Sequence, residues 1–341
     1  MSPITVLHIS DGRSGHSTLA EGLIAAMARR RPVVVVRREV RRPRWLPARA
    51  ISYVWNAGLG PERLLSAVYG IEPAALPRAD VVVSAGGDTL GANVAAARLL
   101  AAPNVFYGSL RRFPPEDFAL VLTSYARNAD RPRHVMSLKP SRFDVDGLPR
   151  PNRRPGVPPV VGLLVGGDAG RQVRFTRSDW DRLVAFLEAM HAADGTRWLV
   201  TNSRRTPDAV ADRLAALASG AGAVARFIDV RRPGSGTLEE LFAACEVLAV
   251  TADSSSMVSE GVWVGRPVVA LEPAACSLDT NEAGYRDWLA RSGWVRSLAI
   301  ARLDPAAFQA CLAQIRPLAV NPLDQLAELL AQRLPQLLAG R

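Results

Sequence analysis

The sequence predicts an α/β protein with two parallel-sheet domains, and three observations lead to this prediction. The chain has 341 residues, which is long for a single core. Short apolar runs that suit buried strands alternate with segments of helical periodicity along most of it. Residues 140–159 interrupt this alternation and are rich in proline and arginine, as linkers are. We therefore expect domains at residues 1–150 and 151–341, the last helix being able to cross back to the first domain.

The N-terminal half opens with an apolar run and continues with strands and helices in turn. Strands are expected at residues 4–9, 33–37, 81–84, 105–107 and 120–123. Apolar residues at helical spacing predict helices at residues 19–29 and 90–101. Residues 38–77 show no clear period, so no element is predicted there.

The same alternation restarts after the linker. Strands are expected at residues 160–165, 198–201, 227–230, 247–250 and 268–271. Helices are expected at residues 178–192, 207–217, 237–245, 254–264, 305–315 and 323–338. Ser178 is the expected cap of the first of these helices. Strands that alternate with helices favour a parallel, Rossmann-like sheet in each half.

Composition excludes several classes of protein. Hydrophobic residues make up 48% and charged residues 22%, as in ordinary globular proteins. No apolar run is long enough for a membrane span, and the N-terminus lacks a signal-peptide pattern, so we expect a cytoplasmic protein. The three cysteines lack metal-site spacing and suit a reduced core. No metal or cofactor is expected.

The net positive charge of the protein comes from the N-terminal half of the chain. Residues 1–155 hold 23 basic and 12 acidic residues, whereas the remainder holds 19 and 20. The N-terminal half therefore suits an anionic surface, such as membrane phospholipid headgroups, or simply has a solvated basic face. A nucleic-acid partner is not expected, because the arginines are not interleaved with aromatic residues and no recognition motif occurs.

Three glycine-containing loops follow predicted strands: "DGRSGH" (11–16), "AGGDTLG" (85–91) and "VGGDAGR" (165–171). Glycine allows a close approach to a ligand, and the following helix offers free N–H groups to a phosphate. A tight strand-to-helix turn is the alternative explanation of each loop alone. Together they indicate a phosphorylated ligand, although none fits a P-loop or dinucleotide fingerprint.

The stretch "TADSSSMVSEG" (251–261) joins a strand to a helix. Asp253 or Ser254 would cap this helix, and the serines in its first turn could hold a diphosphate. Glu260 lies about 6 Å or more further along the helix and could accept hydrogen bonds from a ribose. The alternative is a well-capped helix in which Glu260 pairs with Arg266.

Two further features suit the chemistry of a phosphorylated substrate. In "TNSRRTP" (201–207), Arg204 and Arg205 follow a strand and could pair with phosphate, or could simply be solvated. His16 follows a glycine at the end of the first strand and is a candidate general base.

These motifs have a family likeness. "DGRSGH", "TNSRRTP" and "VTADSSSMVSEGVWVGRPVVAL" resemble the mitochondrial fission Elm-type family, whose bacterial members look like GT-B glycosyltransferases. The likeness spans most of the chain. It implies a GT-B fold, in which two Rossmann-like domains face each other across a cleft.

A more distant likeness concerns the N-acetylglucosaminyltransferase that completes the lipid-linked peptidoglycan precursor. Its glycine loops and Val-Ser-Glu helix correspond to Gly15-His16, Gly86-Gly87, Gly166-Gly167 and Val258-Ser259-Glu260. The likeness implies that His16 lies near the acceptor and Glu260 binds the ribose. It also implies that Gly167, Arg171 and the serine turn hold the diphosphate, with Asn281 near the donor sugar.

We accordingly expect a glycosyltransferase that moves a sugar from a nucleotide-diphospho-sugar donor to a glycan or lipid-linked acceptor at the cytoplasmic membrane face. His16 and Asp88 are the expected catalytic residues. The acceptor side is expected to comprise Asp11, Gly12, Gly15, Gly86 and Gly87. The donor is expected to contact Gly166, Gly167, Arg171, Asn202, Ser203, Arg204, Arg205, Asp253, Ser254, Ser255, Ser256, Glu260 and Asn281.

Two alternatives are kept. A nucleotide-diphospho-sugar epimerase would use paired acid and base groups, for which Asp88, His16 and Asp168 are candidates. A membrane-associated scaffold that keeps the fold without catalysis would show no affinity for nucleotides.

Overall fold

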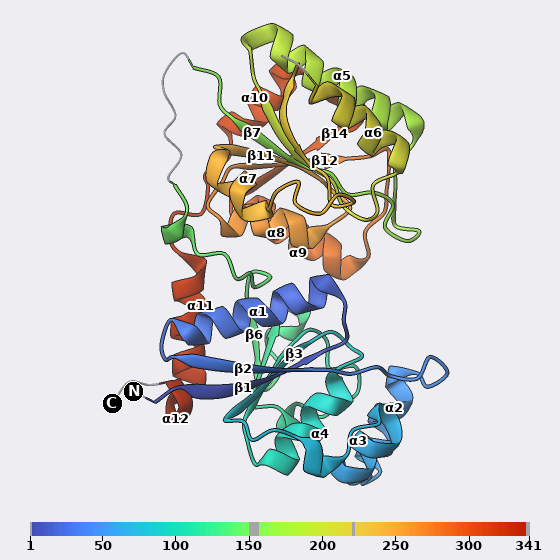
Figure 1. Cartoon of the computed structure of the whole chain (residues 1–341), viewed down its shortest axis with the longest axis vertical. Coiled ribbons are helices and arrows are strands. Elements are labelled where there is room, and N and C mark those ends of the chain that lie inside the picture. The colour runs from blue at the N-terminus through green and yellow to red at the C-terminus, as the bar shows by residue number, and fades with distance from the viewer. Residues whose placement is uncertain (1, 150–156, 220–221, 339–341) are drawn as a thin grey trace. The chain divides into compact units, whose positions relative to one another are not determined.

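A computed structural model describes residues 2–149, 157–219 and 222–338 of the chain. Two compact units are present (Figure 1). The first takes its described residues from Met1–Phe143 and Pro322–Arg341, and the second from Asp144–Asn321. The domain boundary expected between residues 150 and 151 lies outside the described residues.

The first unit contains a parallel six-stranded sheet in the order β2-β1-β3-β4-β5-β6. Its strands are β1 (Ile4–Ser10), β2 (Val33–Glu39), β3 (Val81–Ala85), β4 (Asn104–Tyr107), β5 (Leu120–Thr123) and β6 (His134–Met136). Its helices are α1 (Ser14–Ala28), α2 (Ala48–Asn56), α3 (Pro61–Tyr69), α4 (Leu90–Leu100), α11 (Pro322–Arg333) and α12 (Pro335–Leu338). Short 3-10 helices are η1 (Pro73–Ala75), η2 (Pro115–Asp117) and η3 (Ala126–Asn128).

The end of the chain packs in the first unit. Helix α11 lies beside α1 (Figure 1), and the Arg29 guanidinium pairs with Asp324 at 2.8 Å. Arg30 and Glu328 form a second ion pair between the same helices. A single helix had been predicted over residues 323–338, but α11 ends at Arg333 and α12 starts at Pro335, because proline cannot continue the hydrogen-bonding pattern.

The second unit also contains a parallel six-stranded sheet, in the order β10-β9-β7-β11-β12-β14. Its strands are β7 (Val161–Leu164), β9 (Trp198–Thr201), β10 (Val224–Ile228), β11 (Val247–Thr251), β12 (Val268–Glu272) and β14 (Val295–Ala299). A small antiparallel pair joins β8 (Val173–Arg174) to β13 (Ala275–Cys276). The helices are α5 (Arg177–Asp194), α6 (Asp208–Leu217), α7 (Leu238–Ala244), α8 (Ser255–Trp263), α9 (Thr280–Arg291) and α10 (Pro305–Ala313), with η4 (Val145–Gly147) and η5 (Ile300–Arg302).

The predicted α/β class is confirmed, and some element predictions are corrected. Ser178 does not cap α5, because Thr176 does. The Thr176 hydroxyl accepts from the Asp179 N–H at 3.1 Å, and the Asp179 carboxylate accepts from the Thr176 N–H at 2.8 Å. This reciprocal pair is a capping box and satisfies two N–H groups at the helix start. Among the described residues, no helix is both long and apolar enough to cross a bilayer.

His8 is a buried polar residue of the first sheet. It lies in β1 with 3% of its surface exposed, and its Nε2 atom has no hydrogen-bond partner. Burial lowers the pKa of His8 to about 4, and the nearby Arg37 guanidinium acts in the same direction. The folded protein therefore disfavours protonation of this imidazole.

The pKa of His8 predicts acid sensitivity. Between pH 6.5 and about 4 the unfolded chain binds a proton at His8 that the folded chain does not, so stability falls as the pH falls. At pH 5 we expect a loss of roughly 2 kcal/mol relative to pH 7. Urea unfolding at both pH values should show that His8→Leu reduces this pH dependence by that amount.

Candidate functional site

In each unit, the polar loops follow the carboxyl ends of parallel strands, where α/β proteins bind ligands. The first unit offers the loops after β1 and β3. The second offers the loops after β7, β9 and β11. We describe the two sets of loops separately.

The loop after β1 pairs a carboxylate with an imidazole. His16 Nδ1 lies 2.7 Å from Asp11 Oδ2. The Asp11 side chain is 4% exposed and that of His16 is 30% exposed. Gly12 makes the turn between them with a φ of +76°. With Asp11 accepting from an N–H at Nδ1, the Nε2 atom of His16 becomes an acceptor, which is the form of imidazole that can remove a proton.

The loop after β3 lies directly against this pair. A Cβ atom on Gly86 would be 2.2 Å from His16 Nδ1, and Gly86 has a φ of +89°. Glycine is thus required here for both space and conformation. Gly87 lies against the Arg111 side chain, whose Nε would be 3.1 Å from an added Cβ. Gly15 has open space around it and carries no such requirement.

Asp88 closes the same loop through two ion pairs. Its Oδ1 atom lies 2.9 Å from Arg42 Nε, and its Oδ2 atom lies 3.3 Å from an Arg13 nitrogen. Both carboxylate oxygens are therefore engaged with arginines. This arrangement suits a residue that orders the loop more than one that exchanges protons with a substrate.

In the second unit, Asp253 joins three loops. Its side chain is fully buried and accepts hydrogen bonds from Thr251 Oγ1 at 2.7 Å, Gly167 N at 3.2 Å and Arg205 at 2.5 Å. Burial raises the pKa of the Asp253 carboxyl, and these donors act in the opposite direction. A Cβ on Gly166 would be 2.1 Å from Asp253 Oδ2. The glycines therefore let the carboxylate organise the loops.

The loop after β9 is also tied down from within. The Asn202 side chain is buried, donates to Asp229 Oδ1 at 2.8 Å and accepts from the Val230 N–H at 2.8 Å. Ser203 Oγ accepts from the Arg205 N–H at 3.1 Å. Arg231 holds the pKa of the Asp229 carboxyl well below its usual range. The Asn202 side chain thus bonds to the next loop instead of pointing to an open surface.

The first turn of α8 is partly exposed and offers groups that suit an anion. Ser254 is the N-cap and accepts from the Met257 N–H at 3.3 Å. The backbone N–H groups of Ser255 and Ser256 are left without helical acceptors. Arg286, on α9, donates to Ser255 Oγ at 3.2 Å and to the Ala252 carbonyl at 2.7 Å. A guanidinium and free N–H groups therefore lie together at this helix start.

Arg286 and Glu282 were not among the predicted site residues. Glu282 accepts a hydrogen bond from Ser255 Oγ, so both residues of α9 contact the serine turn. Both residues lie in the same sequence segment as Asn281, but no helix is predicted there, so their position beside the serine turn could not be inferred. Asn281 itself lies in the first turn of α9, where its N–H donates to Asp279 at 2.9 Å.

The other predicted residues lie at the surface or elsewhere in the loops. Ser256 and Glu260 are partly exposed on α8, whereas Arg171 and Arg204 are exposed. The alternative pairing of Glu260 with Arg266 is not formed. The buried Arg266 guanidinium instead donates to the carbonyls of Pro149 at 2.7 Å and Phe242 at 3.0 Å.

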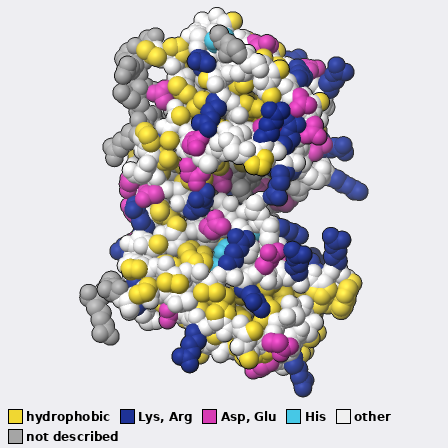
Figure 2. Space-filling model, in the orientation of Figure 1, with side chains coloured by type: hydrophobic (Ala, Val, Ile, Leu, Met, Phe, Trp, Pro, Cys, Tyr) yellow, Lys and Arg dark blue, Asp and Glu magenta, His cyan; other side chains and the backbone are white. Residues whose placement is uncertain are grey.

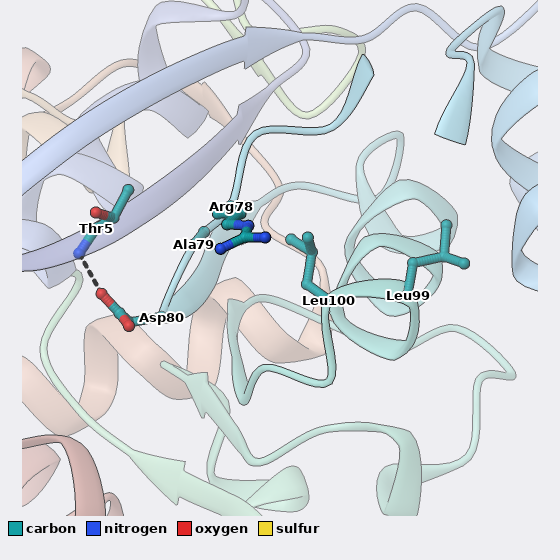
Figure 3. A pocket seen from close by; sticks show the side chains of 6 residues that line it. All are labelled: Thr5, Arg78, Ala79, Asp80, Leu99 and Leu100. Carbon is teal, nitrogen blue, oxygen red and sulfur yellow. Dashed lines mark hydrogen bonds between the residues drawn. The ribbon is translucent and has the colours of Figure 1, made fainter. Parts of the chain in front are cut away.

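Two other findings concern ligands. The described part of the chain contains no cluster of His, Cys, Asp and Glu suited to a metal ion. A hollow of about 440 Å³ lies at the amino ends of β1 and β3 (Figure 3). It is lined by Thr5, Arg78, Ala79, Asp80, Leu99 and Leu100. Because it lies at the other edge of the sheet, it is separate from the Asp11–His16 pair.

The two Rossmann-like units define an α/β protein of the GT-B class, and solved structures match nearly the whole chain. The glycotransferase of kitacinnamycin has a TM-score of 0.50 at 13% identity, covering 99% of this chain and 96% of that one. A putative UDP-N-acetylglucosamine 2-epimerase from Listeria monocytogenes has a TM-score of 0.54 at 12% identity, covering 98% and 97%. MurG from Acinetobacter baumannii has a TM-score of 0.46 at 14% identity, covering 98% and 92%. At such identities the likeness concerns the fold alone.

The sequence identifies the family. The chain belongs to the mitochondrial fission ELM1 family, whose model matches residues 14–334. The family resemblance predicted from the sequence motifs is therefore confirmed. No protein of curated function matches this chain in sequence.

Proposed function

We propose that this protein is a glycosyltransferase. It would move a sugar from a nucleotide-diphospho-sugar to a hydroxyl group of a glycan or lipid-linked acceptor at the cytoplasmic face of a membrane. The Asp11–His16 pair carries the proposal, because it is a base oriented by a carboxylate at the ligand-binding edge of a sheet. The GT-B fold supports it, because the similar structures include a glycotransferase and a putative UDP-N-acetylglucosamine 2-epimerase.

We assign acceptor activation to the first unit. His16 Nε2 removes the proton from the acceptor hydroxyl as its oxygen attacks the anomeric carbon of the sugar. The bond between that carbon and the diphosphate oxygen breaks, and the electron pair leaves with the diphosphate. Asp11 accepts from the Nδ1–H group and stabilises the imidazolium that forms. A single displacement of this kind inverts the configuration of the sugar.

We assign donor binding to the second unit. The Ser255 and Ser256 N–H groups, the Ser255 hydroxyl and Arg286 would receive the diphosphate, with the exposed Arg204 and Arg171 nearby in the loops. These groups would stabilise the charge of the departing diphosphate without a metal. Glu260, further along α8, would accept hydrogen bonds from the ribose.

An epimerase acting on the same type of donor is the second candidate, since a putative epimerase is among the similar structures. That reaction needs a second group that exchanges protons on the sugar. Asp88 has both oxygens in ion pairs, and Asp168 accepts from the Phe175 N–H at 2.9 Å and lies 3.7 Å from Arg174. The described loops therefore offer one oriented base, which favours transfer.

A thermal-shift screen against UDP, GDP, ADP, TDP and CMP and their sugar conjugates tests the proposal. Stabilisation by one nucleoside diphosphate would establish the donor site and identify the nucleobase of the donor. Consumption of the donor sugar only with an added acceptor would then support a transferase. Its isomerisation without acceptor would identify an epimerase. No shift with any nucleotide would favour the scaffold alternative.

Replacing Glu260 by alanine should weaken binding of the nucleotide diphosphate. The substitution removes a charged acceptor for ribose hydroxyls, so we expect a loss of roughly 1–3 kcal/mol of binding free energy. Isothermal titration with the diphosphate identified by the screen would measure it. Asp287→Ala, an exposed carboxylate on α9, is the matched control and should bind normally. Unchanged affinity in folded Glu260→Ala would remove Glu260 from the donor site.

A further inference from the structure

The surface around α2 exposes aromatic and basic side chains together. Trp45 is 80% exposed, Tyr53 is 54% exposed and Val54 is 44% exposed. Arg44, Arg49 and Arg112 are exposed beside them in the sequence or in contact. Figure 2 shows hydrophobic side chains at the tip of the loop before α2, with basic side chains next to them. We call these six residues the α2 patch.

Hydrogen bonds in the surrounding turn keep Trp45 exposed. The Leu46 N–H donates to the Pro43 carbonyl at 3.1 Å and closes a turn around Trp45. Arg42 donates to the carbonyls of Pro43 and Leu46 and also pairs with Asp88. A turn that is braced in this way presents the indole ring to its surroundings. Where such a ring belongs to a larger exposed apolar patch, the patch indicates an interaction site.

Helix α2 carries apolar side chains on its outward side as well as in the core. Ile51 and Trp55 pack into the core, whereas Tyr53 and Val54 point away from it. The Arg112 guanidinium lies over the Tyr53 ring at 5.0 Å and donates to its hydroxyl. The outward face of α2 is therefore an ordered aromatic surface bordered by cations.

The positive charge around α2 favours an anionic partner. Residues 37–56 contain six arginines and a single acidic residue, Glu39. Tryptophan and tyrosine prefer the headgroup region of a bilayer, and arginines beside them attract anionic lipids. A symmetric contact with a second copy would instead bring two such arginine clusters together.

We propose that the α2 patch docks the protein on an anionic phospholipid surface, with Trp45, Tyr53 and Val54 entering the headgroup region. Docking deepens the membrane location in the function proposed above, but it requires no sugar chemistry and is tested without it. One consequence does rest on that function. Arg112 directly follows Arg111, whose side chain lies against Gly87 in the loop that contacts His16. The docked patch would therefore be continuous with the loop that receives a lipid-linked acceptor.

Vesicle sedimentation of the full-length protein tests the docking. We expect binding to vesicles of phosphatidylglycerol and phosphatidylcholine to be at least about tenfold tighter than to phosphatidylcholine alone, and to weaken as salt is added. The double variant Trp45→Ser, Tyr53→Ser should bind the anionic vesicles roughly tenfold less tightly. Arg44→Glu, Arg49→Glu should lose the preference for phosphatidylglycerol.

The controls replace equally exposed residues of the second unit. Val320→Ser and Arg177→Glu should bind vesicles like the unmodified protein. Unchanged melting temperatures would show that all variants are folded. The proposal is overturned if the full-length protein ignores anionic vesicles, or if the α2-patch variants bind them normally. If vesicle binding is absent and the patch substitutions abolish self-association, the patch binds a second copy of the protein. If they abolish oligonucleotide binding instead, it binds nucleic acid. Either result overturns the proposal.

Discussion

Replacement of His16 by alanine is expected to slow sugar transfer by roughly 10²–10⁴-fold while donor affinity stays the same. The substitution removes the acceptor nitrogen that takes the hydroxyl proton, and it leaves the α8 turn of the second unit untouched. Its side chain is 30% exposed and contacts Asp11 and Gly86, so its loss should not unfold the first unit. Single-turnover transfer and nucleotide titration would measure the two effects separately.

Asp11 acts through His16, and its replacement should affect the same step. Asp11→Asn leaves the side-chain shape but removes the charge that stabilises the imidazolium, so we expect a loss of roughly 10²-fold or more in the rate. The loss should appear in single-turnover transfer and leave the donor affinity unchanged. Thr18→Ala, two residues after His16 on α1, is the control and should react normally. A normal rate in folded His16→Ala would overturn the assignment of the base.

Much of the fold could be predicted because strand and helix signals were strong in the core. Strands β7, β9 and β11 are short apolar runs followed by polar loops, so their positions were evident. Helices α2 and α3 were not predicted, because each has only nine residues and is therefore too short for a helical period to be recognised.

The candidate site was less predictable, because its side chains meet through turns and through distant segments. Asp11 and His16 are five residues apart, and the turn at Gly12 brings them together in a way that spacing alone does not indicate. Arg286 reaches Ser255 from 31 residues away. Side-chain direction was equally hidden at Asn202, which bonds to Asp229 in the next loop.

Replacement of Asp253 by alanine is expected to destabilise the second unit strongly. The carboxylate is fully buried and satisfies Thr251, the Gly167 N–H and Arg205 together. Its removal would leave the buried Gly167 N–H without its acceptor, remove the shorter of the two hydrogen bonds that the Thr251 hydroxyl donates, and open a cavity between the loops. We expect the free energy of unfolding to fall by roughly 3 kcal/mol or more, as measured by urea denaturation.

An exposed ion pair of the same unit gives the comparison that isolates burial. Asp208 pairs with Arg231 at 3.0 Å, but its side chain is 84% exposed. Water screens such a pair, so Asp208→Ala should cost less than about 1 kcal/mol. Each substitution removes a carboxylate that pairs with an arginine. The two carboxylates differ in how deeply they are buried and in how many hydrogen-bond donors they accept from. Equal losses would mean that Asp253 does not hold the loops after β7, β9 and β11 together. A large loss at Asp253 alone, with weakened nucleotide binding, would show that the buried carboxylate holds these loops in the shape that the donor requires.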